Sequence, residues 1–80
     1  MAVDSTLLRL FCENLRRMRK SKGVTQVTMA DRLDVSQPAY AQIENGRHAP
    51  TLTTVERIAT ALGVSPLDLL AAGRPGKIAS

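Results

Sequence analysis

TQVTMADRLDVSQPAYAQIENG, residues 25–46, is the part of the sequence that decides the fold. Thr25 is a good N-cap, because its hydroxyl oxygen can accept a hydrogen bond from a backbone N–H of the first helical turn. Met29, Ala30 and Leu33 then recur at helical spacing and form one apolar stripe. These residues predict a short helix that begins directly after Thr25.

A second helix is expected after a tight turn. Asp34 stands where a left-handed backbone would reverse the chain, a conformation that Asp tolerates, though less readily than Gly. Ser36 is the next N-cap, and Pro38 falls in the first turn after it, where a missing N–H costs nothing. The expected inward face and the expected stop are Ala39, Tyr40, Ile43 and Gly46. Two short helices on either side of a tight turn form the arrangement with which proteins place one helix in the major groove of DNA.

Apolar residues at helical spacing predict three further helices. These span about residues 5 to 22, 52 to 62 and 66 to 72. Their expected inward stripes are Leu7, Phe11, Leu15 and Met18 in the first, Leu52, Val55, Ala59 and Leu62 in the second, and a leucine run in the third. Thr51 or Thr53 caps the second, and Ser65 caps the third, which Gly73 is expected to end. The expected fold class is an all-α bundle of five short helices in one domain, 1–73, followed by a flexible tail, 74–80.

The composition favours a small binding module. A chain of 80 residues, 44% of them hydrophobic, supports one domain with a real core. Phe11 and Tyr40 are its only aromatic residues, so the core must be mainly aliphatic. Eleven basic residues against seven acidic ones give a net charge of +4. This surplus favours an anionic partner, with nucleic acid before a membrane surface, and a soluble domain that is merely basic is the alternative.

Several kinds of site are not expected. Cys12 is the single cysteine, which excludes an intramolecular disulfide and a cysteine-rich zinc site, and we expect it to be a small buried group. The lone His48 gives no metal site. No catalytic constellation, cofactor motif or small-molecule site stands out, so an enzyme is not expected. The chain shows no membrane-length apolar run and no leader segment, which makes the cytoplasm the expected location.

Several motifs together resemble one known family. These are ENLRRMRKSKGVTQ (13–26), MADRLDVS (29–36), IENGR (43–47), PTL (50–52) and IATALGVSPLDLL (58–70). The sequence resembles the lambda repressor and Cro-like helix-turn-helix family, also called XRE-type, from about Cys12 to Leu70. Asp34 departs from the family, which usually has glycine in the turn. Pro38 departs as well, since the family often has a polar base-reading side chain there.

The resemblance implies a recognition helix over about 36–45. Gln37 and Gln42 on that helix are the expected base contacts, because a glutamine amide can pair with both N6 and N7 of adenine. Pro38 and Ala39 could only touch thymine methyl groups or permit close approach. The alternative for both glutamines is an ordinary solvent-facing role.

The resemblance also implies contacts with the DNA backbone and one structural ion pair. Gln26 resembles the family's glutamine that binds a phosphate and steadies the first recognition residue. The full expected set of backbone contacts is Thr25, Gln26, Ser36, Asn45, Arg47 and His48. Arg19 and Glu44 are expected to form a partly buried ion pair that orients the recognition helix. The side chains expected to have no direct role are the Tyr40 hydroxyl, at the rim of the core, and the surface charges Arg32 and Arg57.

Recognition in this family usually requires two copies, with recognition helices roughly 34 Å apart. Leu69, Leu70 and Ile78 are expected at a dimer interface, whereas Leu67 is expected to close the core. The function that follows is a homodimeric transcriptional regulator on a palindromic double-stranded DNA operator, such as a phage-type repressor, an antitoxin-type autorepressor or a restriction–modification controller. The alternative is a protein-interaction module of the same fold with only non-specific DNA affinity, which the non-donating Pro38 and Ala39 keep open.

Overall fold

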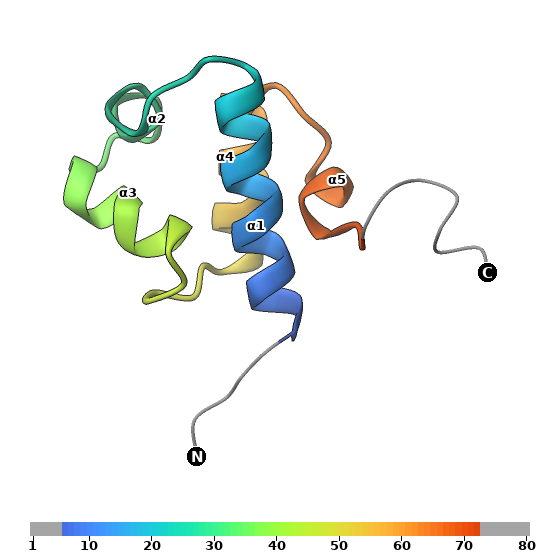
Figure 1. Ribbon diagram of the computed structural model, residues 1–80. Coiled ribbons are helices and arrows are strands. Elements are labelled where there is room, and N and C mark those ends of the chain that lie inside the picture. The colour runs from blue at the N-terminus through green and yellow to red at the C-terminus, as the bar shows by residue number, and fades with distance from the viewer. Residues whose placement is uncertain (1–5, 73–80) are drawn as a thin grey trace.

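The computed structural model describes residues 6–72, and every regular element in that range is a helix. The helices are α1 (Thr6–Ser21), α2 (Gln26–Leu33), α3 (Gln37–Glu44), α4 (Leu52–Leu62) and α5 (Pro66–Leu70). In Figure 1, α2 and α3 lie on one side of α1 and α5 lies on the other. The predicted all-α fold of five short helices is confirmed. No helix among the described residues is long and apolar enough to cross a membrane.

Four of the helices begin at an N-cap residue whose side-chain oxygen caps the first turn, as the sequence predicts. Each oxygen accepts a hydrogen bond from a backbone N–H in the first turn and so satisfies one donor that has no partner within the helix. The pairs are Thr25 with Thr28, Ser36 with Ala39, Thr51 with Thr54, and Ser65 with Leu67. Thr51, rather than Thr53, is therefore the cap of α4.

The turn between α2 and α3 depends on a left-handed residue. Asp34 has φ 59° and ψ 45°, and its N–H donates to the Asp31 carbonyl at 3.1 Å. The N–H of Val35 reaches back to the Ala30 carbonyl at 3.0 Å, which closes the end of α2. Asp34 thus performs the turn that the sequence assigned to it, at a position where glycine would be less strained.

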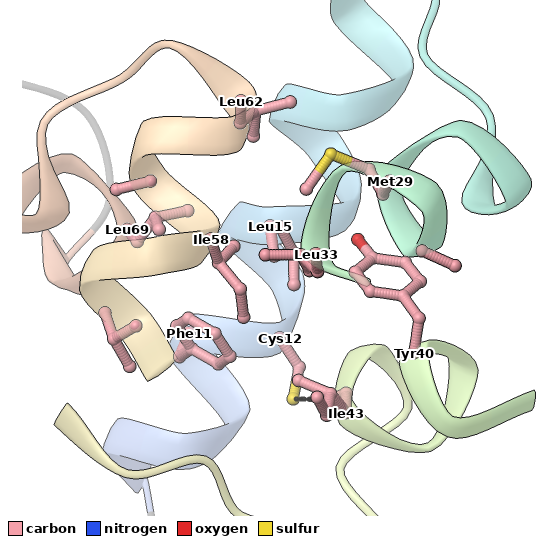
Figure 2. Packing of buried hydrophobic residues seen from close by; sticks show 13 residues of the cluster. Phe11, Cys12, Leu15, Met29, Leu33, Tyr40, Ile43, Ile58, Leu62 and Leu69 are labelled. Carbon is pink, nitrogen blue, oxygen red and sulfur yellow. Dashed lines mark hydrogen bonds between the residues drawn. The ribbon is translucent and has the colours of Figure 1, made fainter. Parts of the chain in front are cut away.

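Buried hydrophobic side chains from all five helices form one core, shown in Figure 2. Phe11, Leu15 and Ile58 lie at its centre, and each is at most 2% exposed. Met29 and Tyr40 join them from the α2 and α3 side. In the middle of the helices, the residues expected to face inward are therefore buried.

Two expectations for the first turns of helices are wrong. Leu7 is 54% exposed, because the inward stripe of α1 runs through the half-buried Leu8 instead. Leu52 is 76% exposed at the first position of α4. Both residues line a surface groove whose other walls are Leu8, Phe11, Ala49, Pro50, Val55 and Leu70.

The expectations for the leucines of α5 are reversed. Leu69, expected at a dimer interface, is fully buried in its own domain, whereas Leu67, expected in the core, is 75% exposed. Side chains two positions apart on a helix point in directions that differ by roughly 200° around its axis, so only one of these two can face inward. Leu70 is half-buried, and α5 ends there, before the expected stop at Gly73. Ile78 and Gly73 lie outside the described residues.

Polar side-chain contacts that the sequence did not reveal connect the helices. Asn14 is 4% exposed, and its Nδ2 donates to the carbonyls of Leu69 and Ala71, each at 2.9 Å. It therefore satisfies carbonyls at the end of α5, which have no partner within that short helix. The expected surface charges Arg32 and Arg57 similarly donate, at 2.8 Å, to carbonyls of Ala61 in α4 and Leu33 in α2.

Replacing Asn14 tests this attachment of α5. The variant Asn14→Ala should lose about 1–3 kcal/mol of unfolding free energy, because the buried Leu69 carbonyl keeps no side-chain donor. Urea denaturation followed by circular dichroism measures the loss. Glu13→Ala, at the exposed neighbouring position, is the control and should change stability by less than roughly 0.5 kcal/mol. Equal stabilities of the two variants would contradict this role for Asn14.

Candidate nucleic-acid interface

A buried ion pair joins α1 to the end of α3. Arg19 Nε donates to Glu44 Oε2 at 2.7 Å, and Arg19 Nη2 donates to Glu44 Oε1 at 2.8 Å. Glu44 is 2% exposed and Arg19 is 8% exposed, so the pair is more deeply buried than expected. The predicted Arg19–Glu44 ion pair is confirmed, with the two-pronged geometry that guanidinium and carboxylate groups favour.

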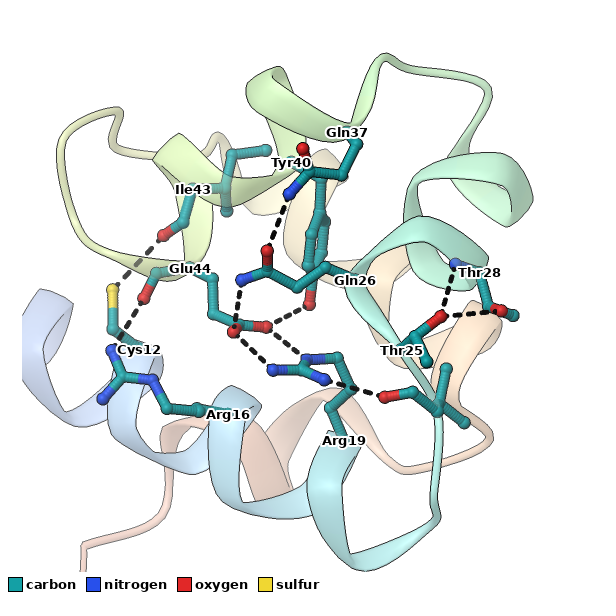
Figure 3. A network of polar contacts seen from close by, with 11 residues as sticks. Cys12, Arg16, Arg19, Thr25, Gln26, Thr28, Gln37, Tyr40, Ile43 and Glu44 are labelled. Carbon is teal, nitrogen blue, oxygen red and sulfur yellow. Dashed lines mark hydrogen bonds and ion pairs between the residues drawn. The ribbon is translucent and has the colours of Figure 1, made fainter.

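Two further donors complete the surroundings of the Glu44 carboxylate, as Figure 3 shows. The Tyr40 hydroxyl donates to Oε2 at 2.6 Å, and Gln26 Nε2 donates to Oε1 at 3.0 Å. Each carboxylate oxygen thus accepts two hydrogen bonds. The Tyr40 hydroxyl is buried in this cluster and does not lie at the rim of the core as expected. The sequence did contain a signal for this contact, since Tyr40 and Glu44 are four residues apart on one helix and are therefore neighbours on its surface.

The charge states in this cluster follow from its donors. Burial by itself raises the pKa of Glu44, but the hydrogen bonds from Arg19, Tyr40 and Gln26 outweigh it and lower the pKa to about 2. Burial, with the adjacent carboxylate, raises the pKa of Tyr40 well above its ordinary value. At neutral pH Glu44 is therefore an ionised acceptor and Tyr40 a neutral donor.

The same end of α3 is held to α1 through its backbone. Arg16 Nη2 donates to the Glu44 carbonyl at 3.5 Å, and the Cys12 thiol donates to the Ile43 carbonyl at 3.4 Å. These carbonyls belong to the last turn of α3, and the Ile43 carbonyl also accepts from the Gly46 N–H at 3.2 Å. The end of α3 is thus fixed by side chain and backbone together, and Cys12 is buried as expected.

The start of α3 is exposed. Gln37 is half-buried, and its Nε2 donates to Gln26 Oε1 at 2.8 Å, while Pro38 and Gln42 are exposed. Ala39, which we expected to face inward, is also exposed, because one residue before the buried Tyr40 lies about 100° away around the helix. The structure therefore brings the four expected base-contact residues onto one short helix and leaves their surfaces largely open.

The residues expected at the DNA backbone surround this helix start. Thr25 and Ser36 are exposed N-caps of α2 and α3, and the Gln26–Gln37 hydrogen bond joins the first turns of these helices. Helix starts with unpaired N–H groups favour phosphate groups. Arg47 and His48 are exposed just beyond α3. Of the expected set, Asn45 is used within the turn, since its Oδ1 accepts from the Arg47 N–H at 3.1 Å.

The expected base and backbone contacts remain predictions. Among the described residues, no group of three or more His, Cys, Asp or Glu side chains could hold a metal ion. What the arrangement offers is a small polar surface at the starts of two helices with a basic side chain beside it. Polar and basic groups arranged in this way suit contact with a nucleic acid, whose backbone is anionic and whose grooves expose polar base edges.

Known proteins share this sequence and fold. A family model described as "Helix-turn-helix" (HTH_3) matches residues 15–69. The chain is 44% identical over 64 residues to the uncharacterized HTH-type transcriptional regulator YqaE of Bacillus subtilis, a match that covers 80% of this chain and 54% of YqaE. It is 37% identical over 62 residues to control protein C.BamHI of Bacillus amyloliquefaciens, which covers 76% of each chain. The chain thus spans only about half of the length of YqaE.

A solved structure agrees with the sequence comparison. The crystal structure of the restriction–modification controller protein C.AhdI from Aeromonas hydrophila superposes with a TM-score of 0.72 at 31% identity, covering 78% of this chain and 90% of C.AhdI. The chain belongs to the helix-turn-helix family that the model describes. The resemblance inferred from the sequence motifs is confirmed, and this family of transcriptional regulators agrees with the expectation that the chain is not an enzyme.

The low pKa of Glu44 predicts a loss of stability in acid. A carboxyl whose pKa is lower in the folded state stabilises the fold above its ordinary pKa, and this contribution disappears as the pH falls through the folded-state value. Between pH 4.5 and about 2 the wild type should lose about 3 kcal/mol through this one group. Urea denaturation at each pH measures the loss.

The control for this prediction is Glu13→Gln, which removes an exposed carboxyl from α1 and should preserve the acid loss. A carbon-13 NMR titration of Glu44 Cδ gives the pKa directly. A midpoint at or above the ordinary value of 4.5 would contradict the role assigned to its four donors.

Proposed function

We propose that the protein is a sequence-specific double-stranded DNA-binding transcriptional regulator that acts as a homodimer on a palindromic operator. The observation that carries the proposal is the division of α3 into two ends. Its last residue, Glu44, is buried in a saturated polar cluster, whereas Gln37 at its first position is half-buried and Pro38 and Ala39 after it are exposed. A helix held at one end and polar at its free end is what insertion into the major groove requires.

The relatives support regulation as the purpose of this binding. YqaE is named a transcriptional regulator, C.BamHI a control protein and C.AhdI a restriction–modification controller protein. The net charge of +4 and the exposed Arg47 beside α3 favour a polyanionic partner. In this proposal Arg47 and the starts of α2 and α3 contact phosphates, and the glutamine side chains contact base edges.

Selection of bound sequences from random duplex DNA at physiological salt tests the proposal. An enriched palindrome with half-sites about one helical turn apart, roughly 34 Å, is the expected result. Retention that depends on salt but enriches no motif would instead favour the protein-interaction module with only non-specific DNA affinity.

Two substitutions separate base reading from backbone contact. Gln37→Ala should reduce discrimination at one position of each half-site by about 1–3 kcal/mol, because a glutamine amide can recognise adenine through two hydrogen bonds. Arg47→Ala should weaken binding to all sequences and lower the salt dependence, because it removes a phosphate contact. Fluorescence anisotropy on matched and single-mismatch duplexes at two salt concentrations measures both. An unchanged sequence preference in Gln37→Ala would show that Gln37 does not read a base.

The exposed side of α5 is the proposed dimer surface. Leu67 is 75% exposed and Leu70 is half-buried beside it, and a large aliphatic group in water favours burial against a second copy. Leu67→Lys should shift the protein toward the monomer in sedimentation velocity and weaken binding to a palindrome. Leu52→Lys, at an equally exposed leucine on α4, is the matched control and should preserve the dimer. If Leu67→Lys remains a dimer and Leu52→Lys becomes a monomer, the interface lies at the start of α4 and the proposed α5 surface is wrong.

A further inference from the structure

We propose that Glu44 determines which end of the Gln37 side-chain amide is turned toward DNA, and that it acts through the Gln26 amide between them. Glu44 is then a positioning residue that sets the preference for adenine without touching the base. The inference rests on the proposed function, in which the start of α3 reads base pairs.

The first step is the polarity of the contact between Glu44 and Gln26. An ionised carboxylate can only accept hydrogen bonds, so any amide that binds it must present its NH₂ group. Gln26 does so, with Nε2 donating to Glu44 Oε1 at 3.0 Å. Turning the Gln26 amide over would place its carbonyl oxygen against the carboxylate, two acceptors with no proton between them. The buried negative charge therefore fixes the orientation of Gln26.

The second step transmits this polarity to Gln37. With its NH₂ group at Glu44, Gln26 must present its carbonyl oxygen on the other side, and Gln37 Nε2 donates to that oxygen at 2.8 Å. Gln37 could not use its own oxygen there, since two carbonyl oxygens would face each other. In Figure 3 the three side chains follow one another from the buried end of α3 to its start.

The third step concerns the hydrogen-bonding groups of Gln37 that remain available to DNA. One N–H of Gln37 is occupied, which leaves its oxygen as an acceptor and its second N–H as a donor. This pair complements adenine, which offers a donor at N6 and an acceptor at N7. A reversed Gln37 amide would use its oxygen on Gln26 and offer two N–H donors, which complement the two acceptors O6 and N7 of guanine. The orientation fixed by Glu44 thus separates adenine from guanine.

Glu44 itself is held firmly enough for this role. Arg19 and Tyr40 supply the other three of its four hydrogen bonds, and the carboxylate is nearly inaccessible to water. Among these donors only Gln26 is connected to Gln37. Glu44 and Tyr40 are both too deeply buried to contact DNA. Gln26 is therefore the donor through which the Glu44 carboxylate can set the orientation of the Gln37 amide.

The test is selection on random duplex DNA with the full chain and three variants. Glu44→Gln replaces the carboxylate by an amide of the same shape, which allows Gln26 to take either orientation. We expect guanine to rise to a frequency comparable with adenine at the Gln37 position, a loss of roughly fivefold or more in discrimination. Gln26→Met leaves the Arg19–Glu44 pair intact and should cause the same loss, which keeps the proposal testable if Glu44→Gln fails to fold.

Tyr40→Phe is the matched control. It removes one hydrogen bond from the same carboxylate but keeps the charge and the Gln26 contact, so adenine should remain preferred. Unchanged adenine preference in both Glu44→Gln and Gln26→Met, or a loss as large in Tyr40→Phe, would overturn the proposal. In the first case the proposed function would stand, with Gln37 reading the base without help.

A measurement on the free protein separates this inference from the proposed function. Scalar couplings across hydrogen bonds in NMR identify donor and acceptor directly. We expect a coupling from Gln37 Nε2 to the Gln26 side-chain carbonyl carbon and another from Gln26 Nε2 to the Glu44 carboxyl carbon. A coupling from Gln26 Nε2 to the Gln37 carbonyl carbon would overturn the fixed orientation, whether or not the wild type selects a motif. With the expected couplings present, a wild type that selects no motif would overturn the proposed function and, with it, this assignment to base reading.

Discussion

The buried carboxylate of Glu44 is the group on which the arrangement around α3 depends. A buried negative charge is tolerated only when donors satisfy it, and here they come from three helices: Arg19 in α1, Gln26 in α2 and Tyr40 in α3. These helices must therefore meet at one point for the charge to be buried at all. Removing Arg19 or Glu44 would leave the other ion uncompensated, a cost of roughly 3–5 kcal/mol in comparable buried pairs. The cluster thus specifies where α3 lies more than it adds net stability.

The shortness of α3 makes this anchoring necessary. Eight residues form a marginal helix in water, so its shape and position come from packing and from its ends. At the buried end, Arg16 and Cys12 donate to its last carbonyls, and at the exposed end Ser36 caps it and Gln26 binds Gln37. The exposed turn can therefore be polar without unfolding. The core supports only one side of α3 and leaves the other available for a partner.

Local chemistry made much of the fold predictable. The caps Thr25, Ser36 and Ser65 and the left-handed Asp34 could be read directly, because each acts on backbone groups a few residues away. The Arg19–Glu44 pair followed from the family resemblance. The reversal of Leu67 and Leu69, and the donation from Asn14 to α5, depend on which neighbours a helix meets, which spacing alone does not specify. In the candidate site the resemblance indicated that Gln26 steadies Gln37, but the contact from Glu44 to Gln26 joins α3 to α2, and no local pattern revealed it. The contacts with DNA remain predictions.

NMR mapping of the DNA-binding surface tests most directly whether the anchored α3 is the face that meets DNA. Nitrogen-15-labelled protein is titrated with a duplex of about two helical turns, roughly 20 base pairs, and the backbone amide shifts are followed. The account predicts the largest changes at the starts of α2 and α3 and around Arg47, with the outer side of α4 almost unaffected. Changes concentrated on α4 and α5, with α3 unperturbed, would contradict it.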